Sequence, residues 1–328
     1  MPAFAQQDKQ LTHYFFNNIT TNPGAAGTNE NICVGLTLRE QWVGFPGNPR
    51  TGAFTFSMPL RPGLGGVGVV VIADQLGASR DFTAKASYAY HARFGEAKNR
   101  ILSFGLNLGI LNKGIDFSIL NPTQLGDAYL SATNSESVMA PDLGFGVFYK
   151  SPTLYFGLSG QELLANPLNY ASGAKSHIDR HYYLTGGYNY KSSPTSDWEF
   201  KPSFLVKTDA VATQFDFNVL AEWRELIWGG LTYRYQDAGT AMVGFYPLSK
   251  GGNSTLKIGY AYDYTFSALK AYTSGSNEIT IRFEFGKETK NIATYQGQIK
   301  EYTGTFTLGA TTPSYDLETA INETFAIH

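Results

Sequence analysis

Two short motifs in the sequence could carry chemistry, and each depends on the element that holds it. Residues 63–68 spell G-x-G-x-x-G, which binds nucleotides only between a strand and a helix. Prolines precede the motif and a β-branched run, 69–72, follows, so a turn and a strand are predicted. Ser267 and Lys270 have the S-x-x-K spacing of serine hydrolases, which place it on a helix. Here the pair falls in an expected hairpin loop.

The histidines and the cysteine do not form a recognisable site. The five histidines are His13, His91, His177, His181 and His328. None of their spacings matches a helical zinc site, and His177 and His181 would stand about 13 Å apart on one strand. The single cysteine excludes a disulfide within the chain. We therefore predict no catalytic residues, no metal and no cofactor, and expect that the protein is not an enzyme.

The composition indicates the class of structure that would hold these residues. Of the 328 residues, 16% are charged and 15% aromatic, whereas about 25% charged residues are usual. A net charge of −2 gives no basic surface for nucleic acid. The longest apolar stretch, 67–73, is far shorter than the roughly 20 residues of a spanning helix. A mean hydropathy of −0.19 with few charges fits a transmembrane β-barrel, whose strands alternate lipid-facing and lumen-facing residues.

Alternation along the chain supports an all-β, antiparallel transmembrane barrel of about 14 strands. In residues 81–94 every charge lies on one parity, while aromatic residues and alanines occupy the other. Residues 256–266 and 278–285 repeat the pattern. The predicted strands are near 31–42, 51–60, 66–75, 80–94, 99–112, 142–150, 153–160, 180–191, 198–208, 213–224, 226–237, 240–248, 254–266 and 276–286.

Loop lengths predict the orientation of the barrel. The long connections, 113–141 and 161–179, follow the fifth and seventh strands and so lie at the same end. Outer-membrane barrels have short periplasmic turns and longer extracellular loops. We therefore expect an integral outer-membrane protein with both termini on the periplasmic side.

Tryptophans fall at the expected rims of the barrel, where their rings would form interfacial girdles. Trp42 ends the first strand at the outer rim, and Trp198, Trp223 and Trp228 lie at the periplasmic end. Glu40 fits less well, because it shares the parity of the lipid-facing leucines before it. It lies either in the outer interface or beside a β-bulge.

The domain organisation is predicted in three parts. Residues 1–30 would hold the end of a signal peptide, with Ala3 and Ala5 as its small residues, followed by a periplasmic or plug segment. Residues 14–27 are too polar to span, so we expect them to plug or brace the periplasmic mouth. Residues 31–286 form the barrel, and 287–328 are a C-terminal extension on the periplasmic side.

The inward parity predicts a polar network in the lumen. Both signs are mixed there, which favours a self-neutralising network over a selective pore with one sign at its constriction. Inward glycines such as Gly105, Gly109, Gly157, Gly187 and Gly259 leave space for a plug, a partner segment or water. The predicted network comprises Arg39, Lys85, Arg93, Asp216, Glu222, Arg234, Lys257, Asp263, Glu278, Arg282 and Glu284.

Two strings carry a family resemblance. Residues 39–45 read Arg-Glu-Gln-Trp-Val-Gly-Phe, and residues 259–264 read Gly-Tyr-Ala-Tyr-Asp-Tyr. With further matches between about 6 and 286, the chain resembles the PorP/SprF family of the Bacteroidota type IX secretion system. The resemblance implies an outer-membrane barrel that works with other type IX components to export and retain large surface proteins, such as gliding adhesins. The 40 or so residues after Gly286 depart from the family pattern.

These expectations combine into one functional hypothesis and one alternative. The barrel would bind the C-terminal domain of an exported adhesin at its outer mouth and anchor it there. The alternative is a passive channel for small solutes, which needs an open lumen. An outer-membrane enzyme is disfavoured because no nucleophile–base pair stands out. The candidate partner-binding residues are Trp42, Phe45, Pro46, Tyr264, Phe266 and Tyr272.

Overall fold

The computed structural model describes most of the chain up to Gly286. The described residues are 9–29, 31–61, 63–95, 99–117, 135–171, 173, 175–193, 195–209, 211–248 and 254–286. The expected signal-peptide remnant at residues 1–8 and the expected extension 287–328 lie outside them, apart from the shared boundary. Within the described part, no helix is long and apolar enough to cross a membrane.

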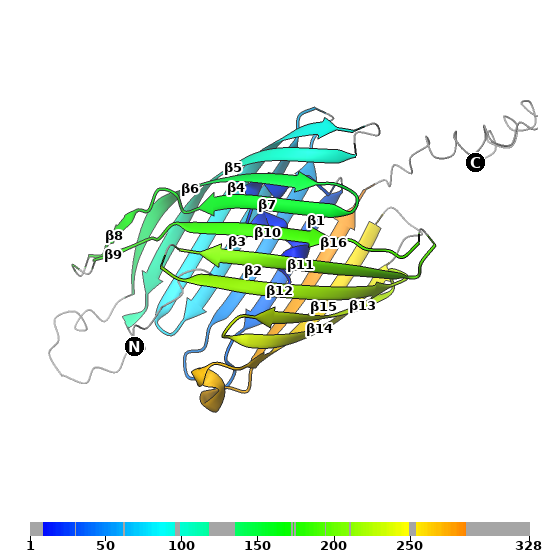
Figure 1. Ribbon diagram of the computed structural model, residues 1–328. Helices are drawn as coiled ribbons and strands as arrows, with labels where there is room; N and C mark the ends of the chain where they lie inside the picture. Colours follow the sequence, from blue (N-terminus) through cyan, green and yellow to red (C-terminus); the bar gives the residue numbers. More distant parts are fainter. Residues whose placement is uncertain are drawn as a thin grey trace, which may run out of the picture. The chain divides into compact units, whose positions relative to one another are not determined.

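Fourteen of the strands in the described part close into one antiparallel barrel (Figure 1). Each strand pairs with its neighbours along the chain, and β1 pairs with β16 to close the ring. The barrel strands are β1 (Ile32–Glu40), β2 (Arg50–Pro59), β3 (Gly66–Leu76), β4 (Ser79–Phe94), β5 (Arg100–Ile115), β6 (Glu136–Lys150), β7 (Leu154–Gln161), β10 (His181–Tyr188), β11 (Trp198–Thr208), β12 (Thr213–Trp223), β13 (Ile227–Arg234), β14 (Ala238–Leu248), β15 (Ser254–Thr265) and β16 (Ser276–Phe285).

The predicted barrel of about 14 antiparallel strands is confirmed, with two differences. β6 begins at Glu136, six residues before the predicted start at 142, because β5 and β6 stay paired beyond the end of β7 as far as Ile115 and Glu136. The predicted loop 161–179 contains a hairpin of β8 (Pro167–Asn169) and β9 (Lys175–His177). Burial of Leu168 and Ile178 against Leu111 and Ala140 holds this hairpin onto the extended part of β5 and β6.

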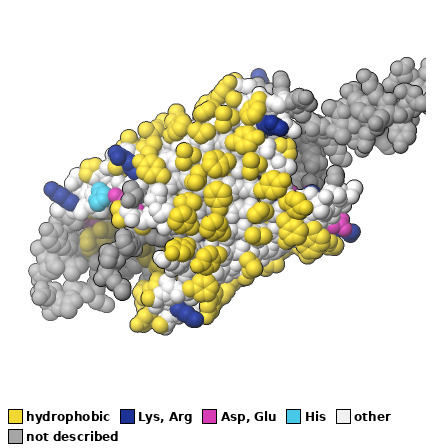
Figure 2. Space-filling view, viewed as in Figure 1, with side chains coloured by type: hydrophobic (Ala, Val, Ile, Leu, Met, Phe, Trp, Pro, Cys, Tyr) yellow, Lys and Arg dark blue, Asp and Glu magenta, His cyan; other side chains and the backbone are white. Residues whose placement is uncertain are grey.

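The strands have one apolar and one polar face. In β1, Leu36 and Leu38 are 42% and 54% exposed, whereas Thr37 and Arg39 between and beyond them are buried. Apolar side chains cover much of the outer wall, and charged side chains lie toward its two ends (Figure 2). The low charge of the whole sequence is therefore the average of an apolar outer face and a polar inner face.

The two ends of the barrel differ in their connections. Loops 41–49, 116–135, 162–180 and 266–275 lie at one end, which we call the long-loop end. Shorter connections such as 151–153 and 224–226 lie at the other, the short-turn end, where β1 begins and β16 ends. The agreement of loop lengths with strand parity is therefore present in the fold.

Two irregularities expected in the strands are resolved by the register. Pairing of β1 runs without a shift through Glu40 to both neighbours, so no bulge lies there. Glu40 instead ends its strand and pairs with Arg50 at 3.0 Å, with both side chains exposed. The register of β14 does shift between Phe245 and Leu248, around Pro247, as expected for a residue that cannot donate to the ladder.

Candidate functional site

The chain before β1 fills the lumen. This lumen segment, residues 9–29, contains three single-turn 3₁₀ helices, η1 (Tyr14–Phe16), η2 (Asn18–Thr20) and η3 (Pro23–Ala25). At the long-loop end Gln10 accepts a hydrogen bond from Gln41, and at the short-turn end Asn29 accepts one from Lys150. The segment therefore runs the length of the barrel, which is deeper than a brace at the mouth.

Glycines on the inner wall leave room for the segment. A Cβ at Gly105 would overlap the backbone nitrogen of Gly24, and a Cβ at Gly66 would overlap the carbonyl oxygen of Ala26. Glycine is the residue that permits such a close approach of two backbones. Two of the five inward glycines named from the sequence, Gly105 and Gly157, contact the segment in this way, since a Cβ at Gly157 would lie 2.8 Å from Nδ2 of Asn22.

A buried carboxylate holds the beginning of the segment. Glu278 of β16 accepts hydrogen bonds from the backbone N–H groups of Thr12 and His13 at 2.7 and 2.8 Å. The same carboxylate lies 2.8 Å from Nδ1 of His13 and 3.2 Å from Nη1 of Arg39. All four groups are buried. The segment and the wall thus satisfy each other's hydrogen bonds, which buried polar groups require.

The buried charges continue along the wall as a chain of ion pairs. Arg39 contacts Asp263 at 2.6 Å, and Asp263 in turn contacts Arg234 at 3.1 Å. Arg234 also lies 3.3 Å from Asp216. Each buried cation therefore faces carboxylates, as desolvated charges must to remain charged.

Further contacts fix the middle and end of the segment. Asn22 donates to the carbonyl oxygens of Val147 and Leu158, while its own side-chain oxygen caps η3 at Gly24. Arg282 donates to the carbonyl of Phe16 and to the side chain of Asn17. The segment is bound by β6, β7 and β16 in addition to the charge cluster.

Most of the residues named from the sequence for a polar lumen face inward. Lys85 pairs with Asp142 at 2.8 Å, Lys201 pairs with Glu222, and Glu284 contacts both Lys257 and Arg282. Arg93 differs, because β4 extends beyond the lumen and its side chain is exposed. The sequence-based set did not include the segment residues Thr12 and His13, because strand parity says nothing of a non-strand segment.

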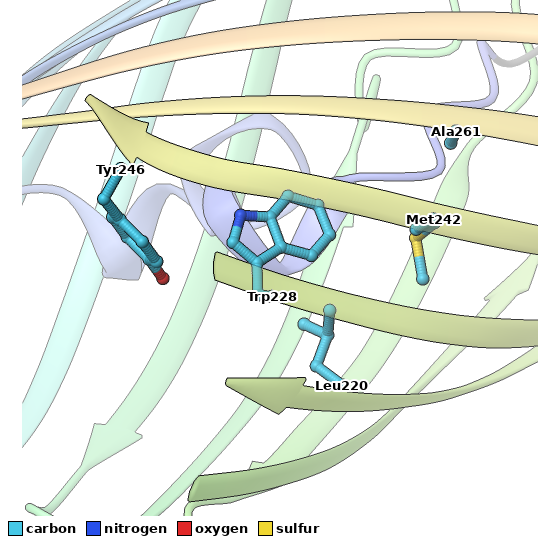
Figure 3. Packing of buried hydrophobic residues seen from close by; sticks show 5 residues of the cluster. All are labelled: Leu220, Trp228, Met242, Tyr246 and Ala261. Carbon is cyan, nitrogen blue, oxygen red and sulfur yellow. The ribbon is translucent and has the colours of Figure 1, made fainter. Parts of the chain in front are cut away.

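Aromatic packing also joins the segment to the wall. Phe15 and Phe16 pack against a cluster of Leu220, Trp228, Met242, Tyr246 and Ala261 (Figure 3). Tyr14 is buried with Tyr183 and Leu205, and this burial raises the pKa of its hydroxyl. The expected position of Trp228 in the interfacial girdle is wrong, since its ring is 3% exposed and faces inward. An inward aromatic was not expected because the segment that covers it is remote in sequence.

The long-loop end presents a rim built from two connected loops. Val43 donates a backbone hydrogen bond to Gly275, and Ser274 donates one to Val43, both at 2.8 Å. Gly77 of the β3–β4 turn donates to Gly47 at 2.9 Å. Loops 41–49 and 266–275 therefore form one surface across the junction of β1 and β16.

The structure brings the six candidate partner-binding residues to this rim or next to it. Trp42, Phe45 and Pro46 lie on the first loop, and Trp42 has a positive φ of 50°. Tyr264 and Phe266, at the end of β15, are in edge-to-face contact at 5.5 Å. Tyr272 ends the 3₁₀ turn η5 (Ala268–Tyr272) and is 68% exposed. The rim is thus rich in exposed aromatic rings.

The positions of the other chemical candidates do not form a reactive pair. His177 lies on β9 beside Asp179, whereas His181 begins β10 and contacts Glu162 at 2.9 Å, so the two histidines are not on one strand. Lys270 lies over the ring of Tyr264 at 4.9 Å. Within the described part of the chain, no three His, Cys, Asp or Glu side chains are grouped to hold a metal ion.

Solved outer-membrane proteins resemble this fold at low sequence identity. The CymD monoaromatic hydrocarbon channel aligns with a TM-score of 0.50 and 13% identity, over 82% of this chain and 92% of its own. The toluene transporter TbuX of Ralstonia pickettii aligns with a TM-score of 0.47 and 10% identity over the same shares. The likeness to CymD supports the barrel fold alone.

Curated proteins match over a short stretch only. The tRNA pseudouridine synthase B of Flavobacterium johnsoniae is 72% identical over 40 residues, and that of Bacteroides fragilis is 58% identical over 40 residues. These stretches cover 12% of this chain and 18% and 17% of the enzymes, so the chain spans less than a fifth of the length of either.

A family model described as "Type IX secretion system membrane protein PorP/SprF" matches residues 3–283, most of the chain. The match spans the lumen segment, all fourteen barrel strands and both loops of the rim. The chain therefore belongs to the PorP/SprF family, and it is an outer-membrane β-barrel associated with the type IX secretion system.

Proposed function

We propose that this barrel anchors an exported surface protein, such as a gliding adhesin, by binding its C-terminal domain at the long-loop end. In this function the long-loop end faces the cell exterior, and the short-turn end, where the barrel begins and ends, faces the periplasm. Other type IX secretion components would contact the periplasmic face. The barrel itself would catalyse no reaction.

The observation that carries the proposal is the filled lumen. The lumen segment is held by buried ion pairs and by glycines that accept its backbone at close range. A protein built to pass solutes through its lumen gains nothing from such a contact surface. A protein that holds a partner at its mouth needs a rigid base, which the bound segment supplies.

The rim supports the site of anchoring. Phe45 and Tyr272 are 39% and 68% exposed on loops that are hydrogen-bonded to each other. Aromatic side chains supply much of the binding energy in protein interfaces, because they bury a large area with few rotatable bonds. Two aromatic groups on one rigid surface suit a folded domain as partner.

The proposal is tested in cells that carry the full-length protein with Phe45→Glu and Tyr272→Glu. We expect the surface proteins with type IX C-terminal domains that depend on this barrel to move from the cell surface to the medium. The measurement is quantitative proteomics of both fractions, with deletion of the barrel defining the dependent proteins. Unchanged surface retention, with the variant present in the outer membrane, would reject the rim as the anchoring site.

A matched control is Tyr190→Glu. Tyr190 is also an exposed tyrosine, 50% exposed, outside the barrel strands, but it follows β10 at the short-turn end. We expect normal surface retention in this variant. Release by both variants to the same extent would indicate a general defect in the barrel and would count against the rim.

The alternative is a passive channel for small solutes, and the likeness in fold to a hydrocarbon channel is the reason to keep it. The two functions differ in conductance. A solute channel conducts in planar bilayers as the unmodified protein, whereas the anchor has its lumen closed by the lumen segment.

A further inference from the structure

A cavity of about 310 Å³ lies at the short-turn end of the lumen. Its wall includes the ends of strands at that end, among them Lys150, Tyr188 and Glu222, and Phe15 and Phe16 of the lumen segment also line it. The segment thus separates the cavity from the long-loop end. The side chains of Lys201 and Lys257 are 30% and 22% exposed, so the cavity is open to solvent.

The wall of this cavity is both aromatic and cationic. Six aromatic rings line it, and among its charged lining residues four cations face two carboxylates. Lys257 is representative, because its ammonium contacts Glu284 at 3.1 Å and lies 5.6 Å from the centre of the Tyr246 ring. The aromatic lining residues are Phe15, Phe16, Phe148, Tyr155, Tyr188, Trp228 and Tyr246, of which the tyrosine Tyr188 is the most exposed, and the charged ones are Lys150, Lys201, Lys257, Arg282, Glu222 and Glu284.

Trp228 provides a second and independent observation. Its indole ring is 3% exposed, and its Nε1 has no hydrogen-bond partner among the described residues. The nitrogen lies on the side of the ring that faces Tyr246, another lining residue (Figure 3). A buried N–H without an acceptor costs about 1–3 kcal/mol, so an acceptor supplied by a ligand would be favoured here.

We propose that this cavity binds a carboxylate attached to an aromatic ring. The ring would stack among the aromatic side chains, and a carboxylate oxygen would accept the Trp228 N–H. The excess of two positive charges on the wall selects an anion over a neutral or cationic ring. The volume is at the lower end of the range for small-molecule pockets, about 300–1,000 Å³, so one ring with a short acidic arm fits. This site is separate from the anchoring rim at the other end of the barrel.

The experiment uses 4-fluorophenylacetate and the full-length barrel in detergent micelles, with binding followed by ¹⁹F NMR. We expect saturable binding, and binding at least about tenfold weaker for 4-fluorophenylacetamide, which lacks the charge. 4-Fluorophenethylammonium should bind no better than the amide. Equal binding of the acid and the ammonium compound would overturn the proposal.

Two variants locate the binding. Trp228→Phe keeps a ring but removes the N–H, and we expect about tenfold weaker binding of the acid, as for a lost hydrogen bond to a charged group. Lys257→Gln removes one positive charge and should also weaken it. Trp198→Phe, on the outer surface at the same end, and Lys113→Gln, paired with Asp81, are the matched controls. Heat-modifiable gel mobility verifies that each variant is folded, and undiminished binding to folded Trp228→Phe would refute the site.

A carboxylate next to a ring occurs both in free small acids and at the C-terminus of a peptide that ends in phenylalanine. A pentapeptide ending in phenylalanine, and its C-terminal amide, distinguish the two. Binding of the peptide acid but not the amide identifies a chain terminus as a ligand, and binding of the free acid alone identifies a small molecule. Absence of binding by both the free acid and the peptide acid would overturn the proposal.

Discussion

The carboxylate of Glu278 accepts the backbone N–H of His13 at 2.8 Å and lies equally close to Nδ1 of the same residue. These residues are 265 positions apart, and both are buried. This contact joins the last strand of the barrel to the segment that precedes the first. It is the point at which the closed lumen can be tested most directly.

Glu278→Ala should destabilise the folded barrel strongly. The change leaves Arg39 with one carboxylate fewer and leaves two backbone N–H groups of the segment without an acceptor. Breaking a buried ion pair in this way costs about 3–5 kcal/mol. Denaturant unfolding in micelles measures the loss. Glu40→Gln is the control, because its exposed pair with Arg50 is worth about 0–1 kcal/mol.

Gly105→Ala should push the lumen segment away from the wall. The added Cβ overlaps the backbone nitrogen and Cα of Gly24, neither of which can rotate aside. Overpacking of this kind costs about 1–3 kcal/mol. We expect faster chymotrypsin cleavage at the aromatic residues of η1. Gly52→Ala meets only Leu38 at 3.6 Å and should cleave at the rate of the unmodified protein, so equal rates for both variants would contradict the close approach.

Deletion of residues 9–27 should convert the barrel into a channel. The unmodified protein is expected to show little conductance in planar bilayers, because the segment occupies the lumen from Gln41 to Lys150. The shortened protein should show stepwise openings with a many-fold larger current. Large currents from the unmodified protein would instead favour the solute channel over the anchor.

Asp209 should make the stability of one turn depend on pH. Partial burial acts to raise the pKa of this carboxyl, but hydrogen bonds from the backbone of Ala212 and Val211 outweigh it and leave the pKa below its usual value. A lowered pKa means that the stabilisation is present above the unfolded pKa, about 3.9, and is lost as the pH falls through the folded value. Asp209→Ala should therefore be less stable than the unmodified protein at pH 7, by about 1 kcal/mol or less, and the difference should shrink toward pH 3. A constant difference across that range would contradict this.

Much of the barrel could be predicted because period-2 alternation is a local property. Each strand carries its own record of which residues meet lipid, so strands such as Ser254–Thr265 could be found one at a time. The sharing of charges between Arg39 and Asp263 was expected only as a general network, because parity gives the face of a residue and not its partner.

The parts that could not be predicted depend on contacts that are distant in sequence. The path of the lumen segment is fixed by Glu278 and by wall glycines such as Gly105, none of which is near the segment in the chain. The same holds for Trp228, whose position at a strand end suggested a membrane girdle until Phe16 was seen to cover it. The β8–β9 hairpin was missed because its strands of three residues are too short for alternation to show.

Arg39 and Glu278 face each other in the register of β1 and β16, the pair of strands that closes the ring. Both also bind the lumen segment, Arg39 through the Thr12 hydroxyl at 2.8 Å and Glu278 through the backbone. The segment therefore bridges the two edges that must find each other last during assembly. We expect it to act as a template for folding, so that its removal slows insertion into membranes even where the finished barrel is stable.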